Sequence, residues 1–278
     1  MMDPHSVKST SIIVLLRSII ANRHLIYQMT KREITGRYRG SFMGVLWSFI
    51  NPVLMLTVYT FVFSVVFKAR WGTGSVSESK SDFAIILFVG LIVHTLFAET
   101  LMRAPTLILG NVNYVKKVIF PLETLSVTSI ASVLFHSIIS LIVLLSAFFI
   151  FNGFIHWTVI FIPLVFFPLI IVSVGLSWFL SSLGVFIRDV GQTIAILTMI
   201  LMFLSPIFYP VSALPEKFQH VIILNPLTFI IEQSRNVIIW GKMPDFTGLA
   251  LYSIAALCLM WLCFFWFQKT RKGFADVL

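Results

Sequence analysis

Long stretches with almost no acidic or basic residue dominate this sequence of 278 residues. Each stretch is long enough for a helix to cross the hydrocarbon core of a bilayer, which takes about 20 apolar residues. A membrane-spanning β-barrel would instead alternate apolar and polar residues, and these stretches do not alternate. We therefore expect an all-α integral membrane protein with six transmembrane helices. The six stretches are residues 42–67, 83–102, 125–151, 157–183, 190–209 and 247–267.

The composition agrees with this fold class. Hydrophobic residues make up 58% of the chain and charged residues 11%, with a mean hydropathy of +0.98, whereas soluble proteins contain about 25% charged residues. We expect one transmembrane domain over residues 1–278, in which a six-span bundle over 42–267 is followed by a short tail over 268–278. Residues 1–10 contain no apolar core with a small-residue cleavage site, so we expect no cleaved signal peptide.

Basic residues predict the orientation. The formal net charge is +9, but the lysines and arginines lie beside the apolar stretches, where they set topology, so we expect no nucleic-acid partner. With both termini in the cytoplasm, 14 of the 20 Lys and Arg residues fall on the cytoplasmic side. This count places Arg235 in the last outer loop. The asymmetry predicts cytoplasmic termini and six crossings.

The predicted spans offer little chemistry of their own. They carry no Asp or Glu near the midplane, which disfavours transport driven by a coupling ion. The sequence contains no Walker A motif, so the chain cannot bind ATP through a P-loop, and any energy must come from a partner. Cys258 and Cys263 do not form a four-ligand set, so we expect no metal site.

His94 and His136 are the ionisable residues well inside the predicted spans. Intramembrane ionisable residues are candidates for function. A neutral histidine is also easily satisfied by a hydroxyl, and Ser132 and Ser140 lie one turn either side of His136. We expect both histidines to have structural hydrogen-bonding roles.

Residues 6–36 are apolar but punctuated by basic residues, a pattern typical of a helix that lies on the membrane surface. On a helical projection the apolar residues share one side, but Arg23 falls among them. A break near Ala21–Asn22 would resolve this conflict. The alternative is a basic tail that only sets topology.

The segment Asn111–Glu123 is a short apolar stretch with paired lysines. Tyr114 can face apolar neighbours while Lys116 and Lys117 remain in water, and Pro121 ends any helix. A cytosolic partner could bind this segment. Alternatively, the lysines only anchor the loop on the cytoplasmic side, and composition does not decide between the two.

The turn Gly184–Gly191 has Arg188 and Asp189 as its only charges. We expect a local ion pair that orients the helix ends, with a partner contact as the alternative.

The last outer segment, Pro210–Thr247, is too apolar for an ordinary loop. We expect two short helices that dip into the outer leaflet, with Asn225 and Pro226 as the turn between them. Such a region would rim an opening, or it would be a simple interfacial cap.

Aromatic residues suggest a path for a substrate. Tyr59, Phe63 and Phe67 recur every four residues in the first stretch, and further aromatic residues crowd the end of the fifth. Aromatic faces stack on the apolar faces of sugar rings, so these residues could form a low-affinity path for a glycan. Contacts with lipid or between helices are the alternative, because the chain has 28 phenylalanines.

Several motifs in register resemble the ABC-2 type permeases that export polysaccharides. The resemblance covers almost the whole chain. The motifs are residues 31–41 (KREITGRYRGS) with Gly44, Trp47 and Pro52, residues 113–123 (NYVKKVIFPLE), Arg188 with Asp189, residues 205–210 (SPIFYP), residues 225–228 (NPLT), and Arg235.

This resemblance implies a transport subunit, not an enzyme, that pairs with itself and with two copies of a separate P-loop ATPase, which binds ATP and Mg²⁺. The complex would export a lipid-linked polymer such as O-antigen, capsule or teichoic acid across the cytoplasmic membrane of a bacterium. ATP binding would move the coupling segments and reshape a channel at the dimer axis, lined mainly by the first and fifth spans.

The resemblance also assigns residues to roles. The surface helix over 6–36 includes Arg32 and is followed by Arg37, Tyr38 and Arg39. The ATPase-coupling residues are Asn113, Tyr114, Lys116, Lys117, Phe120, Pro121, Glu123, Arg188 and Asp189. The channel residues are Trp47, Tyr59, Phe63, Phe67, Phe203, Phe208 and Tyr209. The external gate, two helices within 212–243, includes Asn225, Pro226 and Arg235.

Two alternatives remain at this point. An ABC-2 permease that exports drugs or lipids would have a similar sequence pattern but a compact ligand. A membrane-embedded glycolipid or acyl transferase would need a cluster of Asp, Glu or His near one membrane face, and the acids of this chain are scattered singly.

Overall fold

The computed structural model describes residues 11–67, 71, 80–116 and 120–278. Within these residues every regular element is a helix, so the predicted all-α class is confirmed. Lys117, the first residues of the predicted surface helix and most of the first outer loop lie outside the described residues.

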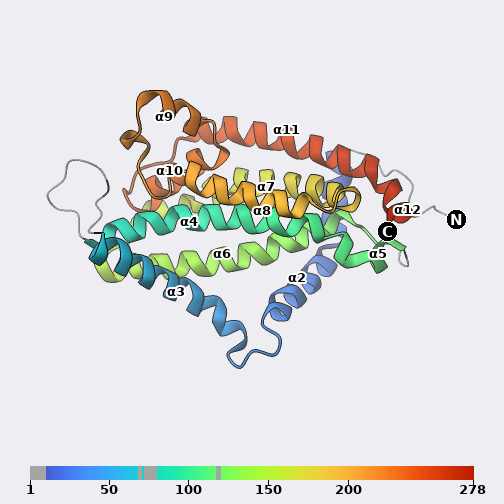
Figure 1. The fold of residues 1–278 in the computed structure, drawn as a ribbon, viewed down its shortest axis with the longest axis horizontal. Helices are drawn as coiled ribbons and strands as arrows, with labels where there is room; N and C mark the ends of the chain where they lie inside the picture. Colours follow the sequence, from blue (N-terminus) through green and yellow to red (C-terminus); the bar gives the residue numbers. More distant parts are fainter. Residues whose placement is uncertain (1–10, 68–70, 72–79, 117–119) are drawn as a thin grey trace.

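Long helices run side by side along the length of the molecule (Figure 1). Within the described residues, five segments are long and apolar enough to cross a membrane. They are Gly44–Phe63, Phe83–Thr106, Glu123–Asn152, Trp157–Phe186 and Phe246–Val277. They contain the helices α3 (Trp47–Tyr59), α4 (Lys80–Arg103), α6 (Glu123–Asn152), α7 (Ile162–Phe186) and α11 (Phe246–Thr270).

The fifth predicted span is shorter than expected. It forms α8 (Val190–Leu204), which at 15 residues is about 22 Å long and does not cover a hydrocarbon core of about 30 Å. The helix ends because Ser205, which precedes Pro206, adopts an extended conformation with ψ 149°. A sixth crossing therefore remains a prediction, and the predicted helical boundary at residue 209 is wrong.

The helix α4 lies at the centre of the bundle. It contacts α6, α7, α8 and α10 (Pro226–Ile238), and its apolar side chains supply much of the core. Helices in a bilayer associate through close packing, because lipid tails are as apolar as the side chains themselves. The packing of α4 therefore positions the surrounding helices relative to one another.

The helices α7 and α11 approach each other closely at Gly175. A Cβ atom at this position would lie 2.7 Å from the Cα atom of Met260. We expect Gly175→Leu to push the two helices apart and to destabilise the protein by about 1–3 kcal/mol, the usual cost of overpacking. Thermal unfolding in detergent measures this effect. Gly191→Leu is the control, since a Cβ atom at Gly191 would meet no packed neighbour within 4 Å among the described residues; equal unfolding temperatures for the two variants would contradict the prediction.

The N-terminal segment forms two helices, α1 (Ile12–Ala21) and α2 (Arg23–Arg37). The predicted break near Ala21–Asn22 is confirmed. Asn22 leaves the helical conformation, and its side-chain amide donates to the carbonyl of Ser18 at 2.8 Å. The apolar side chains of α1 that do not pack on the bundle, such as Ile13 and Ile20, are more than half exposed.

Two short helices, α9 (Glu216–Ile223) and α10, form in the last predicted loop. Asn225 caps α10 by accepting a hydrogen bond from the amide of Leu227 at 2.9 Å, and Pro226 is the first residue of the helix, where its missing N–H costs nothing. The turn predicted at Asn225 and Pro226 is therefore confirmed, while its role as a gate stays a prediction. Figure 1 shows α9 and α10 at one end of the bundle and α5 (Val112–Lys116) with the C-terminus at the other. We call these the α9 end and the α5 end.

Candidate functional site

Apart from Trp47, the predicted channel residues of the first and fifth stretches come together at the α9 end. The Phe63 ring lies 6.4 Å from Tyr59 and 5.8 Å from Phe67 along its own helix. It also lies 6.3 Å from Phe208, which in turn lies 5.9 Å from Phe203. These five rings form one connected row, which we call the aromatic row. The aromatic row brings together two segments that lie about 140 residues apart in the sequence.

The aromatic row is half open. Phe67 is 67% exposed and Phe203 is 59% exposed, so one protein chain covers only part of the row. Tyr209 extends it, since its hydroxyl donates to the carbonyl of Phe203 at 2.8 Å. Trp47, the other predicted channel residue, begins α3 and lies at the opposite end of that helix from Tyr59.

Arg235, which the charge count places in the last outer segment, is buried among the helices. Its side chain is 0% exposed and donates to the carbonyls of Ile86 at 3.3 Å and Ile207 at 3.1 Å. It also pairs with Glu232 at 2.8 Å, and its guanidinium lies 4.3 Å from the centre of the Trp71 ring. The helices therefore enclose Arg235, and its place on the outer side of the membrane remains a prediction.

The burial of Arg235 has a structural consequence. Burial lowers the pKa of the guanidinium to about 10, so the group still carries its charge at neutral pH. Its hydrogen bonds fasten α10 to α4 and to the turn that follows α8. Asn225 adds a second link, because its amide donates to the hydroxyl of Ser205 at 2.9 Å. Two of the three predicted gate residues, Asn225 and Arg235, thus hold α10 on the bundle.

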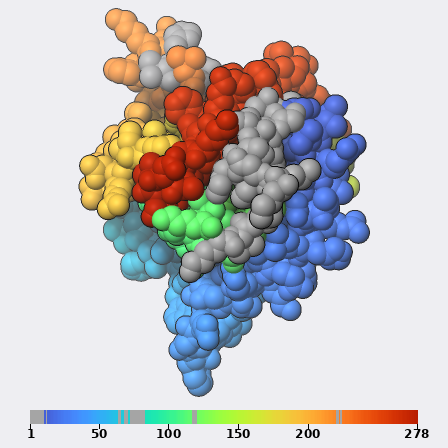
Figure 2. All heavy atoms as spheres, turned by 90° about the vertical axis from the view of Figure 1, so that its right-hand side faces the viewer, coloured from blue at the N-terminus to red at the C-terminus, as the bar shows by residue number. Residues whose placement is uncertain are grey.

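The predicted coupling segment lies at the α5 end, where Figure 2 shows α5 in green beside the red C-terminal segment. Asn113 and Lys116 are exposed on α5. The ring of Tyr114 stacks on that of Phe120, with centroids 4.4 Å apart, and its hydroxyl accepts a hydrogen bond from Arg32 at 3.2 Å. Phe120 itself is buried and Pro121, next in the chain, is partly buried.

Glu123 lies inside the protein rather than on the predicted contact surface. It is 2% exposed and pairs with Arg271 at 3.1 Å. It also accepts a hydrogen bond from Ser18 at 2.9 Å, and its backbone carbonyl accepts one from the Trp178 indole at 3.0 Å. Arg271 donates in addition to the carbonyl of Phe120 at 3.1 Å. Glu123 thus connects the coupling segment to α1, α7 and the C-terminal tail.

The pair Arg188 and Asp189 does not form the predicted ion pair. Both side chains are exposed in the turn between α7 and α8, and within the described residues no salt bridge joins them. Asp189 begins α8 through its backbone, since its carbonyl accepts from the amide of Thr193 at 3.2 Å. The side chains of Arg188 and Asp189 are therefore exposed and accessible to a partner.

Sequence reasoning missed a cluster of four charges that joins α2 to α4. Glu99 accepts from Arg37 at 2.6 Å and from Arg103 at 2.5 Å, and Arg103 also pairs with Glu33 at 2.8 Å. Burial raises the pKa of Glu33, and the charge of Arg103 opposes that rise. The four-residue spacing of acid and base on each helix was a signal for this cluster, because such residues share a helix face.

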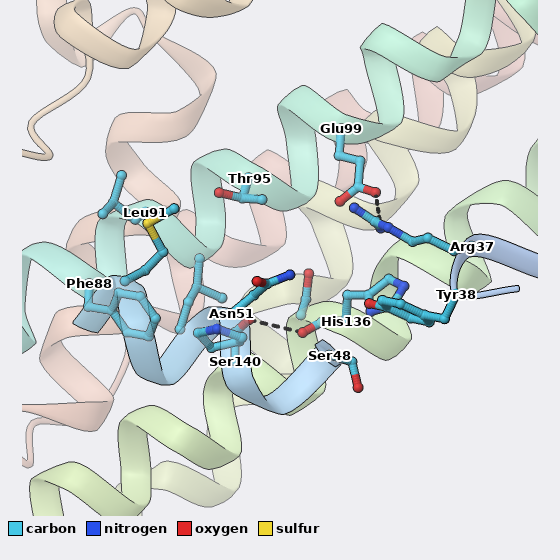
Figure 3. Close-up of a pocket in the computed structure, with 14 residues that line it drawn as sticks. Arg37, Tyr38, Ser48, Asn51, Phe88, Leu91, Thr95, Glu99, His136 and Ser140 are labelled. Atoms are coloured by element: carbon cyan, nitrogen blue, oxygen red, sulfur yellow. Dashed lines mark hydrogen bonds and ion pairs between the residues drawn. The ribbon is translucent and has the colours of Figure 1, made fainter. Parts of the chain in front are cut away.

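A cavity of about 200 Å³ lies beside this cluster, between the end of α2 and the helices α3, α4 and α6 (Figure 3). We call it the α2–α6 cavity. Its lining includes Arg37, Tyr38, Asn51, Leu91, Glu99 and His136.

The two intramembrane histidines differ in their hydrogen bonding. His94 lies 3.0 Å from the carbonyl of Thr198 through Nε2, so it links α4 to α8, as a structural role requires. His136 lines the α2–α6 cavity, and its Nε2 is buried with no hydrogen-bond partner among the described residues. Ser140 donates to the backbone carbonyl of His136, not to the ring. The predicted serine partner of His136 is therefore wrong.

The sequence matches the ABC-2 type transporter family over residues 24–239. It is 26% identical over 266 residues to the O-antigen export system permease protein RfbA of Myxococcus xanthus, and this alignment covers 95% of this chain and 99% of the relative. An RfbA protein of Klebsiella pneumoniae is 25% identical over 257 residues, which are 91% of this chain and 95% of that relative. The polysialic acid transport protein KpsM of Escherichia coli is 23% identical over 234 residues, which are 83% of this chain and 86% of that relative.

Proposed function

This chain belongs to the family of ABC-2 type transporters, and we propose that it is the permease subunit of an exporter of lipid-linked polysaccharide, such as O-antigen, in the cytoplasmic membrane of a bacterium. The observation that carries the proposal is the match along nearly the whole chain to permeases named for O-antigen export. The sequence contains no P-loop, so two copies of a separate ATPase would supply the energy.

In this proposal two copies of the chain enclose the channel. The half-open aromatic row supports such an arrangement, because a second copy would supply the facing wall. Exposed aromatic rings suit a glycan that must slide, since each contact is weak and every sugar ring has an apolar face. The helices α9 and α10, held in place through Asn225 and Arg235, would close the channel at its outer end.

The α5 end would face the cytoplasm and receive the ATPase. Asn113, Tyr114 and Lys116 are accessible there, and Lys117 follows directly in the sequence. The exposed charges of Arg188 and Asp189 would form the smaller contact. Phe120 and Glu123, which are buried, would transmit movement of this surface into the bundle and would not touch the ATPase.

Replacing Phe63 tests the aromatic row. We expect Phe63→Ala to slow polymer export by about two- to tenfold, because one aromatic contact contributes about 0.5–1.5 kcal/mol. Export is measured as the rate at which labelled polymer reaches the cell surface. Phe167→Ala is the matched control, since Phe167 is exposed on α7 outside the row. Equal rates for both variants and the unchanged protein would remove Phe63 from the path.

Depleting the chain in its host tests the function as a whole. We expect lipid-linked polymer to accumulate inside the cell and to disappear from the surface, and re-expression to reverse both effects. Normal surface polymer together with a gain in drug sensitivity would contradict polysaccharide export and favour a permease for small compounds.

A further inference from the structure

The α2–α6 cavity changes from charged to apolar along its length. Arg37 and Glu99 lie at one end, whereas Phe88 and Leu91 lie at the other. On α4 the step from Glu99 to Phe88 is eleven residues, or about 16 Å at 1.5 Å per residue. Glu99 lies one turn from the end of α4, so the polarity of the cavity follows the direction from the membrane surface to its interior.

The cavity is much larger than a site for one water molecule. Its volume of about 200 Å³ exceeds the ~10–15 Å³ that one water requires more than tenfold. Figure 3 shows Asn51, His136 and Ser140 grouped between the charged and the apolar ends. A ligand that fits this lining has a charged group, then hydrogen-bonding groups, then an apolar chain.

The charges at the polar end are balanced. Arg37 and Arg103 carry two positive charges, and Glu33 and Glu99 carry two negative charges, within one connected cluster. A neutral cluster does not favour a polyanion such as a diphosphate. It suits a ligand that carries one positive and one negative group. Arg37, with its side chain 43% exposed, has further N–H donors for a negative group, and both arginines bind Glu99 through the same oxygen, Oε1, so its second oxygen can accept from a positive group.

His136 also indicates a ligand. Its Nε2 atom is buried without a partner among the described residues, and a buried polar atom left unpaired costs about 1–3 kcal/mol. The ring is held edge-on against Tyr38, with centroids 5.9 Å apart. A ligand oxygen at the middle of the cavity would satisfy this nitrogen.

We propose that the α2–α6 cavity binds one phospholipid with a primary ammonium and a phosphate in its headgroup, as in phosphatidylethanolamine. The ammonium binds Glu99 and the phosphate binds Arg37. The ester region lies beside Asn51 and His136, and an acyl chain follows Leu91 toward the membrane interior. A quaternary ammonium cannot donate a hydrogen bond to Glu99, so a choline lipid binds more weakly.

This lipid site does not depend on the exported substrate. It joins α3, which carries part of the aromatic row, to the end of α2 and to α4. A bound lipid would therefore fill the space behind the first span and hold that span in place. The headgroup comes from the membrane leaflet at the α5 end, because Glu99 lies near that end of α4 (Figure 1).

Native mass spectrometry of the full-length chain, released from nanodiscs that contain ethanolamine, choline and glycerol phospholipids in equal amounts, tests the proposal. We expect one retained lipid, with the ethanolamine lipid favoured over the glycerol lipid by about tenfold or more, since a hydrogen bond to a charged group contributes about 1.5–3 kcal/mol. Leu91→Trp, which fills the cavity and leaves its charges unchanged, should remove the retained lipid. Arg39→Gln, at an exposed residue outside the lining, should not.

Four results would overturn the proposal. One is the absence of a retained lipid in the unchanged protein, which would leave a water-filled cavity. The second is equal retention of the three lipids, and the third is retention unaffected by Leu91→Trp in protein whose thermal unfolding is normal. The fourth is displacement of the ethanolamine lipid by an equimolar polyprenyl diphosphate, which would assign the cavity to an anionic substrate lipid.

Discussion

Replacing Glu123 with alanine will lower the free energy of unfolding by about 3–5 kcal/mol, because the substitution leaves the charge of Arg271 buried without its partner. Arg271 is 4% exposed, so water cannot solvate the guanidinium. The loss is measured as a shift of the unfolding midpoint in detergent. Asp189→Ala is the control, since Asp189 is exposed and forms no salt bridge within the described residues; it should change stability by less than about 0.5 kcal/mol.

A double variant separates lost pairing from lost packing. Glu123→Leu with Arg271→Met removes both charges and keeps apolar volume in their place, so most of the stability lost in Glu123→Ala should return. If Glu123→Ala unfolds at the same midpoint as the unchanged protein, or if the double variant is as unstable as the single one, the buried pair does not hold this region together.

Reversing the charge of both Lys116 and Lys117 will reduce export by about tenfold or more while ATP hydrolysis continues. Lys116 is exposed at the end of α5, and Lys117 follows it. A like-charge contact with an acidic surface of the ATPase costs several kcal/mol, and each 1.4 kcal/mol is a factor of ten. The measurement is ATP hydrolysis and polymer export by the reconstituted complex, with recovery of the ATPase in a pull-down.

The control for the lysine variants lies at the other end of the molecule. Lys217→Glu makes the same change at an exposed residue of α9, far from the α5 end in Figure 1, and should leave coupling intact. If the Lys116 and Lys117 variant exports polymer and retains its ATPase normally, the two lysines only set the topology of the loop, as the composition also allowed.

Local signals allowed much of the fold to be predicted from the sequence. The apolar stretches identify the long helices. Arg23 falls on the apolar side of a continuous helix over residues 6–36, and this conflict indicates the break between α1 and α2. Asn225 and Pro226 mark the start of α10 because capping and a fixed φ act within one turn. Pro206 also carried a local signal, for the early end of α8, but the apolar run that continues to residue 209 concealed it.

Contacts between distant segments could not be predicted in the same way. Arg271 and Glu123 are 148 residues apart, and Arg235 is 149 residues from the carbonyl of Ile86 that it binds. From the sequence alone, each arginine is expected in a loop or tail that is exposed to water. Their burial depends on the final packing of several helices, and so does the α2–α6 cavity, which exists only where four helices meet.

The central claim is that this chain is one half of a passive channel, driven by a separate ATPase. The most direct test is transport of lipid-linked polymer into vesicles that contain the purified chain, with and without the ATPase, at a fixed concentration of ATP. We predict transport against a gradient only when both proteins and ATP are present. Uphill transport or bond formation by the chain alone would contradict the claim.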